Sequence, residues 1–498
     1  MQSRFRLLLC VFSISLGGAV IGIDSGIIAT AIAQPSFNDY MFPPGTKNAS
    51  SLLGAIVSMG SAGSAVGSLA VGFMLERLGR RWTLAISTLF TVLGSLFQTV
   101  ANGPALMIVG RLIAGIALGI LTPAIPVYVS ELAKPNERAR LVGIFGLILS
   151  LGFCIANWIG YACSFGEGSY MWRLQLAMQI PLAVVLLVMT YFLPESPRWL
   201  AERDRLDQFN KTIRRIYGVE DEEFLSRMAV EIREQIALET TQRSSATLGH
   251  ALIELFNRKY IARTAMAIAV LQVGILSGSL AIQNYQSLLY GALGFEGKGI
   301  LLISGCYGFM GVIGQIINLA GVSDKWPRVR TMWVGCIVLA CMLSVVAALS
   351  KEFGDGQNAA GARAGIAFIF LYSAIYAVFF NSTLYTIAAE MFPQHLRGYG
   401  TGIAALCQGV SGIWMGQITP YAFAAISWKY YFVFIGSLLG LGALYAFGLV
   451  ETNQVSLEQI AGKFGDRTVS QEKVDILTSD KATPGHVEAV EDNVDSKL

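Results

Sequence analysis

The sequence predicts an all-α membrane protein whose twelve membrane-spanning helices form two pseudo-symmetric bundles of six. Composition is the first indication, because 54% of the 498 residues are hydrophobic and only 14% are charged, whereas soluble domains carry about 25% charged residues. The apolar residues also gather in long runs, and about 20 such residues form a helix that crosses a bilayer. The third indication is a pair of charged motifs that occurs in both halves of the chain.

Each half of the chain contains six apolar runs. Those of the first half lie near residues 7–30, 51–75, 82–101, 105–130, 140–162 and 172–193. Those of the second half lie near residues 259–285, 300–322, 331–350, 363–389, 399–424 and 428–449. We therefore expect an N-terminal six-helix bundle (1–193), a cytoplasmic helical linker (194–258), a C-terminal six-helix bundle (259–449) and a largely disordered cytoplasmic tail (450–498). Apolar spacing over 222–239 fits an amphipathic helix, which favours a helical cap in the linker over a purely solvated segment.

Lysine and arginine gather in the loops on one side of the predicted spans. The loops at 77–81, 134–140 and 325–330 are rich in these residues, whereas loops on the opposite side have fewer. Loops rich in basic residues stay in the cytoplasm, so both termini are expected inside the cell. Asn48, which begins the sequence Asn-Ala-Ser, then lies outside, where a glycan can be attached.

Two motifs occur once in each half, at matching places between the spans. "ERLGRR" begins at Glu76 and "SDKWPRVR" begins at Ser323, each between the second and third spans of its half. "ELAKPNER" (131–138) and "EMFPQHLR" (390–397) each place Glu and Arg seven positions apart around an internal proline. A duplicated set of six spans is the plan of transporters that rock about a central substrate site.

The residue patterns that would indicate a soluble enzyme do not occur. The seven cysteines lie in apolar stretches without metal-ligand spacing, and the three histidines are scattered. No nucleotide-binding loop and no nucleophile motif is present in the sequence. We predict no enzymatic activity, no metal, no cofactor and no nucleic-acid partner.

Six motifs in family order resemble the sugar porter family of the major facilitator superfamily, in a fungal-like form. They are "ERLGRR" (76–81), "GRLIAGIALG" (110–119), "PVYVSELA" (126–133), "PESPRWL" (194–200), "AAEMFPQHLRG" (388–398) and "ETNQVSLEQI" (451–460). The resemblance implies the major facilitator fold and transport of a small-molecule substrate through the lipid bilayer of the plasma membrane, by a protein that acts as a monomer.

Asp24 places a carboxylate inside an apolar run, at the position where the family has a Gly-aromatic-Asp-x-Gly pattern. The resemblance implies that Arg111, on the fourth span, lies close to it. A charge at the bilayer centre costs several kcal/mol, and an acid left without its basic partner takes up a proton. Rocking that separates the pair would make Asp24 a proton carrier. The alternative is a permanent ion pair that only fixes helix packing.

A second set of charged residues lies at the predicted cytoplasmic ends of the spans. The family uses these positions as a clasp that joins the two halves on the inside. The residues are Glu76, Arg77, Arg80, Arg81, Glu131, Arg138, Glu195, Arg198, Glu390 and Arg397. The alternative is that the arginines only set the membrane topology, although acidic residues contribute little to topology. Pro327 stands where the family usually has glycine, which predicts a weaker clasp in the second half.

The positions at which sugar porters usually bind hexoses have changed in this chain. Amides are replaced by Gly146, Gly274, Ile275 and Leu280, a tryptophan by Tyr385, and an Asn-Trp pair by Gln408 and Gly409. An ordinary hexose would lose many partners there, and each unpaired buried polar group costs about 1–3 kcal/mol. Other polar residues within the spans form a rearranged candidate set: Gln272, Gln283, Asn284, Gln315, Asn318, Asn381, Tyr385 and Gln408. Each of them is alternatively a helix–helix contact.

These features together predict a secondary active transporter of a small polar solute, such as a sugar, a polyol or a related hydroxylated compound. Proton symport by alternating access is the leading mechanism. The alternatives are a passive facilitator, an exporter of a non-sugar metabolite, or a nutrient sensor that does not transport.

Overall fold

The computed structural model describes residues 2–464, apart from 44–45, 47, 135–136, 167, 218–229, 231–233, 235–247, 293–294, 296, 324, 354–357, 454, 456–459 and 461. In this part of the chain every regular element is a helix. The amphipathic helix predicted over 222–239 and the tail after residue 464 therefore lie almost wholly outside the described residues.

The described residues of the first half form eight helices. They are α1 (Gln2–Ile32), α2 (Pro35–Met41), α3 (Ala49–Arg77), α4 (Arg80–Thr99), α5 (Pro104–Leu132), α6 (Arg138–Cys163), α7 (Tyr170–Ala177) and α8 (Gln179–Phe192). The described part of the predicted linker contains α9 (Pro197–Glu202), α10 (Leu206–Tyr217) and α12 (Leu248–Leu255).

The second half contains the remaining elements. They are α13 (Ile261–Leu276), α14 (Ser279–Asn284), α15 (Gln286–Ala292), α16 (Lys298–Ile317), the π-helical turn η2 (Asn318–Val322), α17 (Arg328–Phe353), α18 (Ala359–Phe379), α19 (Thr383–Glu390), α20 (Gln394–Ile426), the 3-10 turn η3 (Ser427–Tyr430) and α21 (Tyr431–Gly448).

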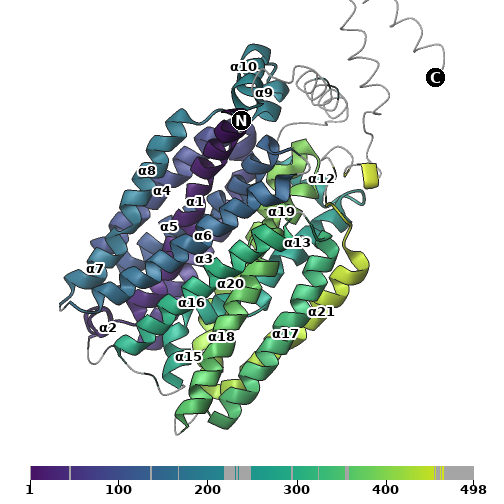
Figure 1. Cartoon of the computed structure of the whole chain (residues 1–498). Helices are drawn as coiled ribbons and strands as arrows, with labels where there is room; N and C mark the ends of the chain where they lie inside the picture. The colour runs from purple at the N-terminus through teal and green to yellow at the C-terminus, as the bar shows by residue number, and fades with distance from the viewer. Residues whose placement is uncertain are drawn as a thin grey trace, which may run out of the picture.

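Eleven segments among the described residues are long and apolar enough to cross a membrane. The sequence predicts twelve spans. The difference of one arises because the last segment, His395–Gly448, contains two helices, α20 and α21, joined by η3. The all-α membrane architecture is confirmed. Figure 1 shows the two halves side by side, with the first half in purple and blue and the second half in green and yellow.

Each half has its own hydrophobic core. One cluster is built from first-half residues such as Val11, Val129 and Phe145. Another is built almost entirely from second-half residues such as Leu271, Leu339 and Phe434. Such separate cores allow each half to move as a unit, although the domain boundaries themselves stay predictions.

Two spans of the second half are interrupted near their middle. The break between α13 and α14 falls at Gly278, whose φ of +85° is strained for any residue with a side chain. The break between α18 and α19 spans 380–382. Broken helices free backbone and side-chain polar groups inside the protein, and transporters place such breaks at their substrate sites.

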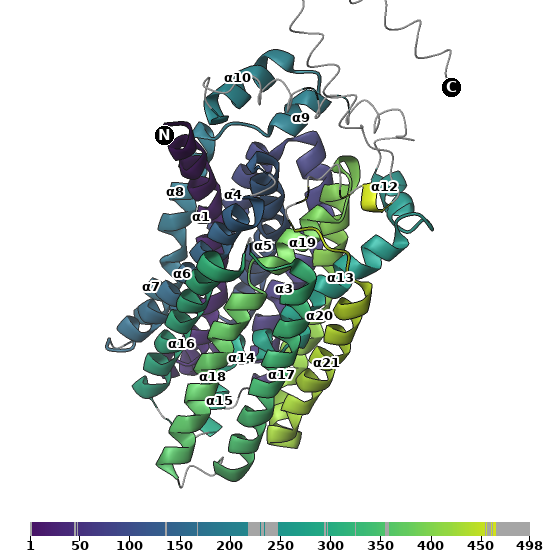
Figure 2. The ribbon, with the colours of Figure 1, turned by 45° about the vertical axis from the view of Figure 1, so that its right-hand side comes forward.

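The first turns of α1 and the helices α9, α10 and α12 lie at one end of the bundle (Figures 1 and 2). The C-terminal ends of α3 and α5 lie at this same end, because Trp199 of α9 donates a hydrogen bond to the Glu76 carbonyl and Ser196 donates one to Glu131; the basic residues Arg80 and Lys134 follow these ends. We call it the basic end. Asn48 precedes α3, at the other end of that helix, and is exposed there.

Candidate functional site

A cavity of about 210 Å³ lies between the two halves. The first half contributes lining residues from α1, α3, α5 and α6, and the second half contributes them from α13, α14, α18, α19 and α20. The volume is below the roughly 300–1,000 Å³ of pockets that hold drug-sized ligands. The cavity therefore suits a small solute, at the interface where two rocking halves would expose it alternately.

Asp24 and Arg111 meet at the wall of this cavity. Arg111 Nη1 donates a hydrogen bond to Asp24 Oδ2 at 2.9 Å, and both side chains are buried. A Cβ at position 60 would lie 2.7 Å from Arg111 Nη2, so Gly60 makes room for the guanidinium. Asp24 Oδ1 and Arg111 Nε have no hydrogen-bond partner among the described residues. The pair is thus formed as expected, while its part in proton coupling stays a prediction.

Five of the eight candidate substrate residues line the cavity. They are Gln283, Asn284, Asn381, Tyr385 and Gln408. The structure does not bring Gln272, Gln315 or Asn318 to it. Gln272 is half-buried, with its Oε1 atom lacking a hydrogen-bond partner in the described part of the chain.

Gln315 and Asn318 instead belong to a buried amide network that joins the halves. Gln315 Nε2 donates to the Gly143 carbonyl at 3.3 Å and to Ser382 Oγ at 3.2 Å. Asn318 Nδ2 donates to the Val378 carbonyl at 2.6 Å. Since Gly143 belongs to α6 and the others to the second half, these amides act here as contacts between helices.

The space left by two glycines is filled by amides from other helices. A Cβ at Gly146 would lie 2.9 Å from Gln315 Nε2. A Cβ at Gly274 would lie 2.6 Å from Gln408 Nε2, which donates to the Leu271 carbonyl at 3.1 Å. At both positions the amide donates to protein acceptors: Gln315 to the Gly143 carbonyl and Ser382 Oγ, and Gln408 to the Leu271 carbonyl.

A smaller chamber of about 70 Å³ adjoins the cavity and shares Ser25, Gln283, Tyr376 and Asn381 with it. Hydroxyl groups dominate its polar lining: those of Ser25, Ser150, Tyr307, Ser373 and Tyr376. The sequence reasoning missed Ser150, Tyr307 and Ser373 because isolated hydroxyls in apolar runs carry no spacing signal.

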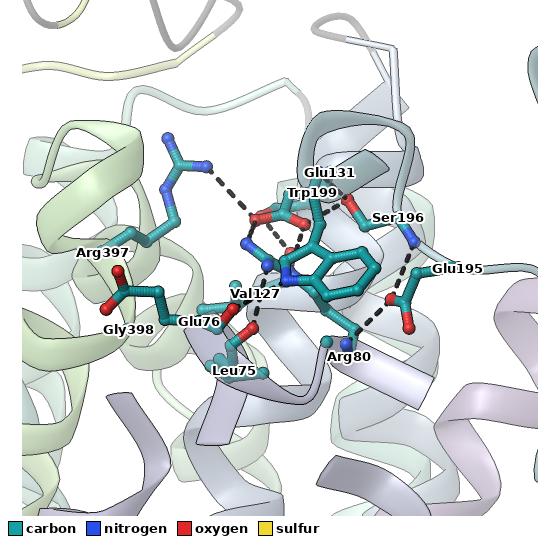
Figure 3. A network of polar contacts seen from close by, with 12 residues as sticks. Leu75, Glu76, Arg80, Val127, Glu131, Glu195, Ser196, Trp199, Arg397 and Gly398 are labelled. Carbon is teal, nitrogen blue, oxygen red and sulfur yellow. Dashed lines mark hydrogen bonds and ion pairs between the residues drawn. The ribbon is translucent and has the colours of Figure 1, made fainter. Parts of the chain in front are cut away.

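At the basic end, Glu131 of the first half holds two arginines (Figure 3). Arg80 binds it with two hydrogen bonds of 2.7 and 2.8 Å. Arg397, from α20 of the second half, brings its Nη1 atom to 3.7 Å from Glu131 Oε1. Ser196 Oγ donates to the same carboxylate at 2.5 Å, and Glu195 accepts the backbone N–H of Arg80 at 2.8 Å.

Glu390 of the second half repeats this arrangement. Arg328 binds it with two hydrogen bonds of 2.8 Å each, and Arg138 of the first half approaches it to 3.4 Å. Thr452 Oγ1 donates to Glu390 at 2.8 Å, and Glu451 accepts the backbone N–H of Arg328 at 3.0 Å. Pro327 therefore does not prevent the two hydrogen bonds between Arg328 and Glu390.

The sequence reasoning missed the parts played by Arg328, Glu451 and Thr452, and by Ser196. The signal that could have found them is the matching dipeptides Glu195-Ser196 and Glu451-Thr452, each of which follows the last span of its half.

The other predicted clasp residues have more local contacts. Glu76 accepts a hydrogen bond from Tyr399 of the second half at 2.6 Å, so it also joins the halves. Arg77 lies over the ring of Phe73, and Arg81 lies over the rings of Trp82 and Tyr191.

Burial also shifts the pKa of groups near the clasp. It raises the pKa of Tyr217 to about 12, while the positive charge of the nearby Arg198 opposes this rise. Burial also raises the pKa of the Glu195 carboxyl, while backbone N–H donors and Arg80 oppose that shift.

Two helical halves that share a central cavity and are clasped at one end define a membrane transporter of the major facilitator type. The chain belongs to the sugar (and other) transporter family, whose family model matches residues 10–464. It is accordingly a multi-pass membrane transporter and not an enzyme.

Three known proteins illustrate the similarity. The MFS-type transporter criB of Aspergillus cristatus is 31% identical over 92% of this chain and 94% of its own length. The quinate permease of Neurospora africana is 29% identical over 94% of this chain and 90% of its own. The solved structure of the proton:xylose symporter XylE of E. coli superposes with a TM-score of 0.81 at 20% identity, covering 93% of this chain and 100% of that one.

Proposed function

We propose that this transporter imports a small hydroxylated solute across the plasma membrane together with a proton. The observation that carries the proposal is the Asp24–Arg111 pair at the wall of a cavity between the halves. A buried acid that loses its basic partner binds a proton, and one that regains it releases the proton. Because Asp24 on α1 and Arg111 on α5 belong to the same half, the alternation requires solute binding or a shift of α1 against α5, in addition to the rocking of the halves.

The clasp defines the state in which the basic end is closed. Arginine–glutamate pairs between described residues hold this end, and two of them, Arg138–Glu390 and Arg397–Glu131, cross between the halves. We assign this end to the cytoplasm because it carries the basic loops. Breaking the crossing pairs would open the cavity to the cytoplasm, where the solute and the proton leave.

The solute class is supported by the mixed polar lining of the cavity and by the relatives. Amides, phenols and small hydroxyls face the cavity alongside aliphatic side chains, which suits a compact solute with both polar and apolar surface. One relative is a quinate permease and one structural neighbour is a proton:xylose symporter. Both names fit a compact solute with several hydroxyl groups.

The remaining assignments follow from orientation. Both termini are cytoplasmic, the linker caps the basic end, and Asn48 faces the outside where it can be glycosylated. The protein acts as a monomer, with the lipid bilayer, protons and the solute as its partners. Enzymatic removal of glycans from the wild type and from an Asn48→Gln variant tests the orientation.

Reconstituted vesicles test the function. Radiolabelled sugars, polyols and hydroxy acids are offered with and without an inward proton gradient. Accumulation above equilibrium only with the gradient is the expected result. Equal uptake under both conditions would identify a passive facilitator, for which the Asp24–Arg111 pair is a permanent packing contact.

A further inference from the structure

We infer that the transported solute is a polyhydroxylated carboxylic acid, bound as its monoanion with the carboxylate on Arg111 while Asp24 carries the proton. This inference rests on the proposed proton-coupled function and specifies its substrate class. It predicts that each cycle moves one proton and one anion, so that the net charge carried by the solute and proton is zero.

The charges that line the cavity are the first argument. Among the described residues that line the cavity and its side chamber, Asp24 is the one acid and Arg111 the one base. The unprotonated cavity is therefore neutral, and protonation of Asp24 leaves it with one positive charge. A neutral solute would leave this guanidinium uncompensated in a buried site, which is costly. A monoanion restores neutrality.

Apart from Arg111, the described residues around Asp24 include no charged group that could bind the carboxylate of the solute. The phenols of Tyr376, Tyr385 and Tyr307 titrate near pH 10 in water. Three of the helices that pack on α1 have no charged residue: α8, α14 and α15. On the remaining helices that pack on α1, the charged residues other than Arg111 lie towards the ends of the spans or on α2 and α10, which are not among the spans: Asp39, Glu131, Arg138, Arg140, Arg173, Asp207, Lys211, Arg214 and Arg215.

The geometry of the pair is the second argument. Arg80 and Glu131, at the clasp, are joined by two parallel hydrogen bonds, the arrangement that guanidinium and carboxylate prefer. Arg111 and Asp24 share one bond, and Arg111 Nε and Asp24 Oδ1 are left without partners in the described structure. A pair built only for packing would be expected to use both bonds. Arg111 itself lines the cavity, so protonation of Asp24 would release its guanidinium to a second carboxylate.

The side chamber supplies the hydroxyl end of the site. Ser25 Oγ donates to the Ile21 carbonyl and Ser373 Oγ to the Tyr307 carbonyl, so both oxygens remain acceptors. Acceptors suit the hydroxyl protons of a solute. Ser25 follows Asp24 directly in α1 and lines both spaces, so that a carboxylate on Arg111 and hydroxyls in the chamber can belong to one molecule.

A neutral hexose is less well served by the same lining. The amide N–H groups of Gln408 and Asn381 donate to protein acceptors, the Leu271 carbonyl for the first and the Gly146 carbonyl and Ser150 Oγ for the second. Unpaired sugar hydroxyls would cost affinity at each such position. The strongest attraction left in the cavity is the charge on Arg111.

Competition experiments test the inference without altering the protein. Vesicles containing the full-length protein are given a panel of polyhydroxylated acids, including gluconate and quinate, and the methyl ester or amide of each acid. Each compound is assayed as a competitor of the others and by its stabilisation of the purified protein. We expect at least one acid to bind about tenfold or more tightly than its uncharged derivative, since loss of one charge-assisted bond is worth that factor. If no acid is preferred over its derivative, or if none binds, the inference is wrong.

Transport energetics provide a second, independent readout. Uptake of the preferred acid should follow the pH gradient and be unchanged when a potassium-diffusion potential is imposed. Saturable uptake of a neutral sugar with an inward current would overturn the inference while leaving proton coupling intact. Uptake that ignores the pH gradient would instead overturn the proposed function. Arg111→Gln should weaken acid binding about tenfold or more, whereas Arg173→Gln, an arginine that contacts Tyr40 away from the cavity, should not.

Discussion

Glu131 and Glu390 are equivalent: each carboxylate holds one arginine of its own half through two hydrogen bonds and one arginine of the other half. Both side chains are fully buried. Because the pairs across the halves are reciprocal, opening the basic end must break both, whereas the pairs within each half can persist while the half moves as a unit.

Glu131→Gln should therefore shift the protein towards the state that is open at the basic end. Removing one partner of a buried ion pair costs about 3–5 kcal/mol, and here Arg80 and Arg397 both lose it. Labelling of cysteines introduced near the cavity should become faster from the cytoplasmic side. Glu352→Gln is the matched control, because Glu352 forms an exposed pair with Lys351. Equal labelling in the two variants would contradict the clasp.

Thr452→Val tests the corresponding contact in the second half. The variant keeps the size of the side chain and removes the hydroxyl that donates to Glu390. We expect a smaller opening effect than that of Glu131→Gln, about 1–3 kcal/mol, since one bond to a buried charged group is lost. The same labelling assay measures it. Ser196→Ala should have a similar effect in the first half, and a difference of several kcal/mol between the two would argue against equivalence of the halves.

Glu195 should make the closed state sensitive to acid. Burial raises its pKa in the closed state, so this state binds a proton more readily than one in which Glu195 is exposed, with an ordinary pKa near 4.3. Acidification from neutral pH towards that value should therefore favour closure, and the effect should vanish as pH rises above the elevated pKa. Cytoplasmic labelling between pH 7.5 and 5 measures it. Glu195→Gln should remove this contribution, while Asp204→Asn, an exposed neighbour, should retain it.

Much of this arrangement could be predicted from residue patterns. The apolar runs give the spans, and the two Glu–Arg spacings of seven locate both centres of the clasp. The resemblance to the sugar porter family implied that Arg111 lies close to Asp24, and the cost of a lone charge in an apolar run agrees with that pairing. The spans and the Glu–Arg spacings depend on properties of single segments, which the sequence contains directly.

The substrate candidates were harder to predict because their contacts depend on how each helix is rotated. Gln315 and Asn381 both lie within predicted spans, yet Gln315 points between helices while Asn381, in the break between α18 and α19, reaches both the cavity and α6. The amide pattern cannot reveal that Gly146 leaves space for Gln315. Such a complementary pair is visible only after the helices are packed.

The amide network suggests a stability prediction. Gln315→Leu fills a similar volume but leaves the Gly143 carbonyl and Ser382 without the donor they now have. We expect a loss of about 1–3 kcal/mol in the stability of the closed state, seen as a lower thermal midpoint in detergent. Gln272→Leu is the comparison, because the Gln272 Oε1 atom is already unpartnered among the described residues. A larger loss for Gln272→Leu would mean that the network contributes little.

Asp24→Asn is the sharpest test of proton coupling. Asparagine keeps the shape of the side chain but can neither carry a proton nor pair ionically with Arg111. Accumulation against a gradient should be lost, while exchange of labelled for unlabelled solute, which needs no net proton movement, should continue. The loss should hold at every pH, since no titrating group replaces the carboxylate in the described lining of the cavity. Exchange serves as the control for folding, and an Asp24→Asn protein that still accumulates solute in response to a pH gradient would exclude Asp24 as the proton carrier.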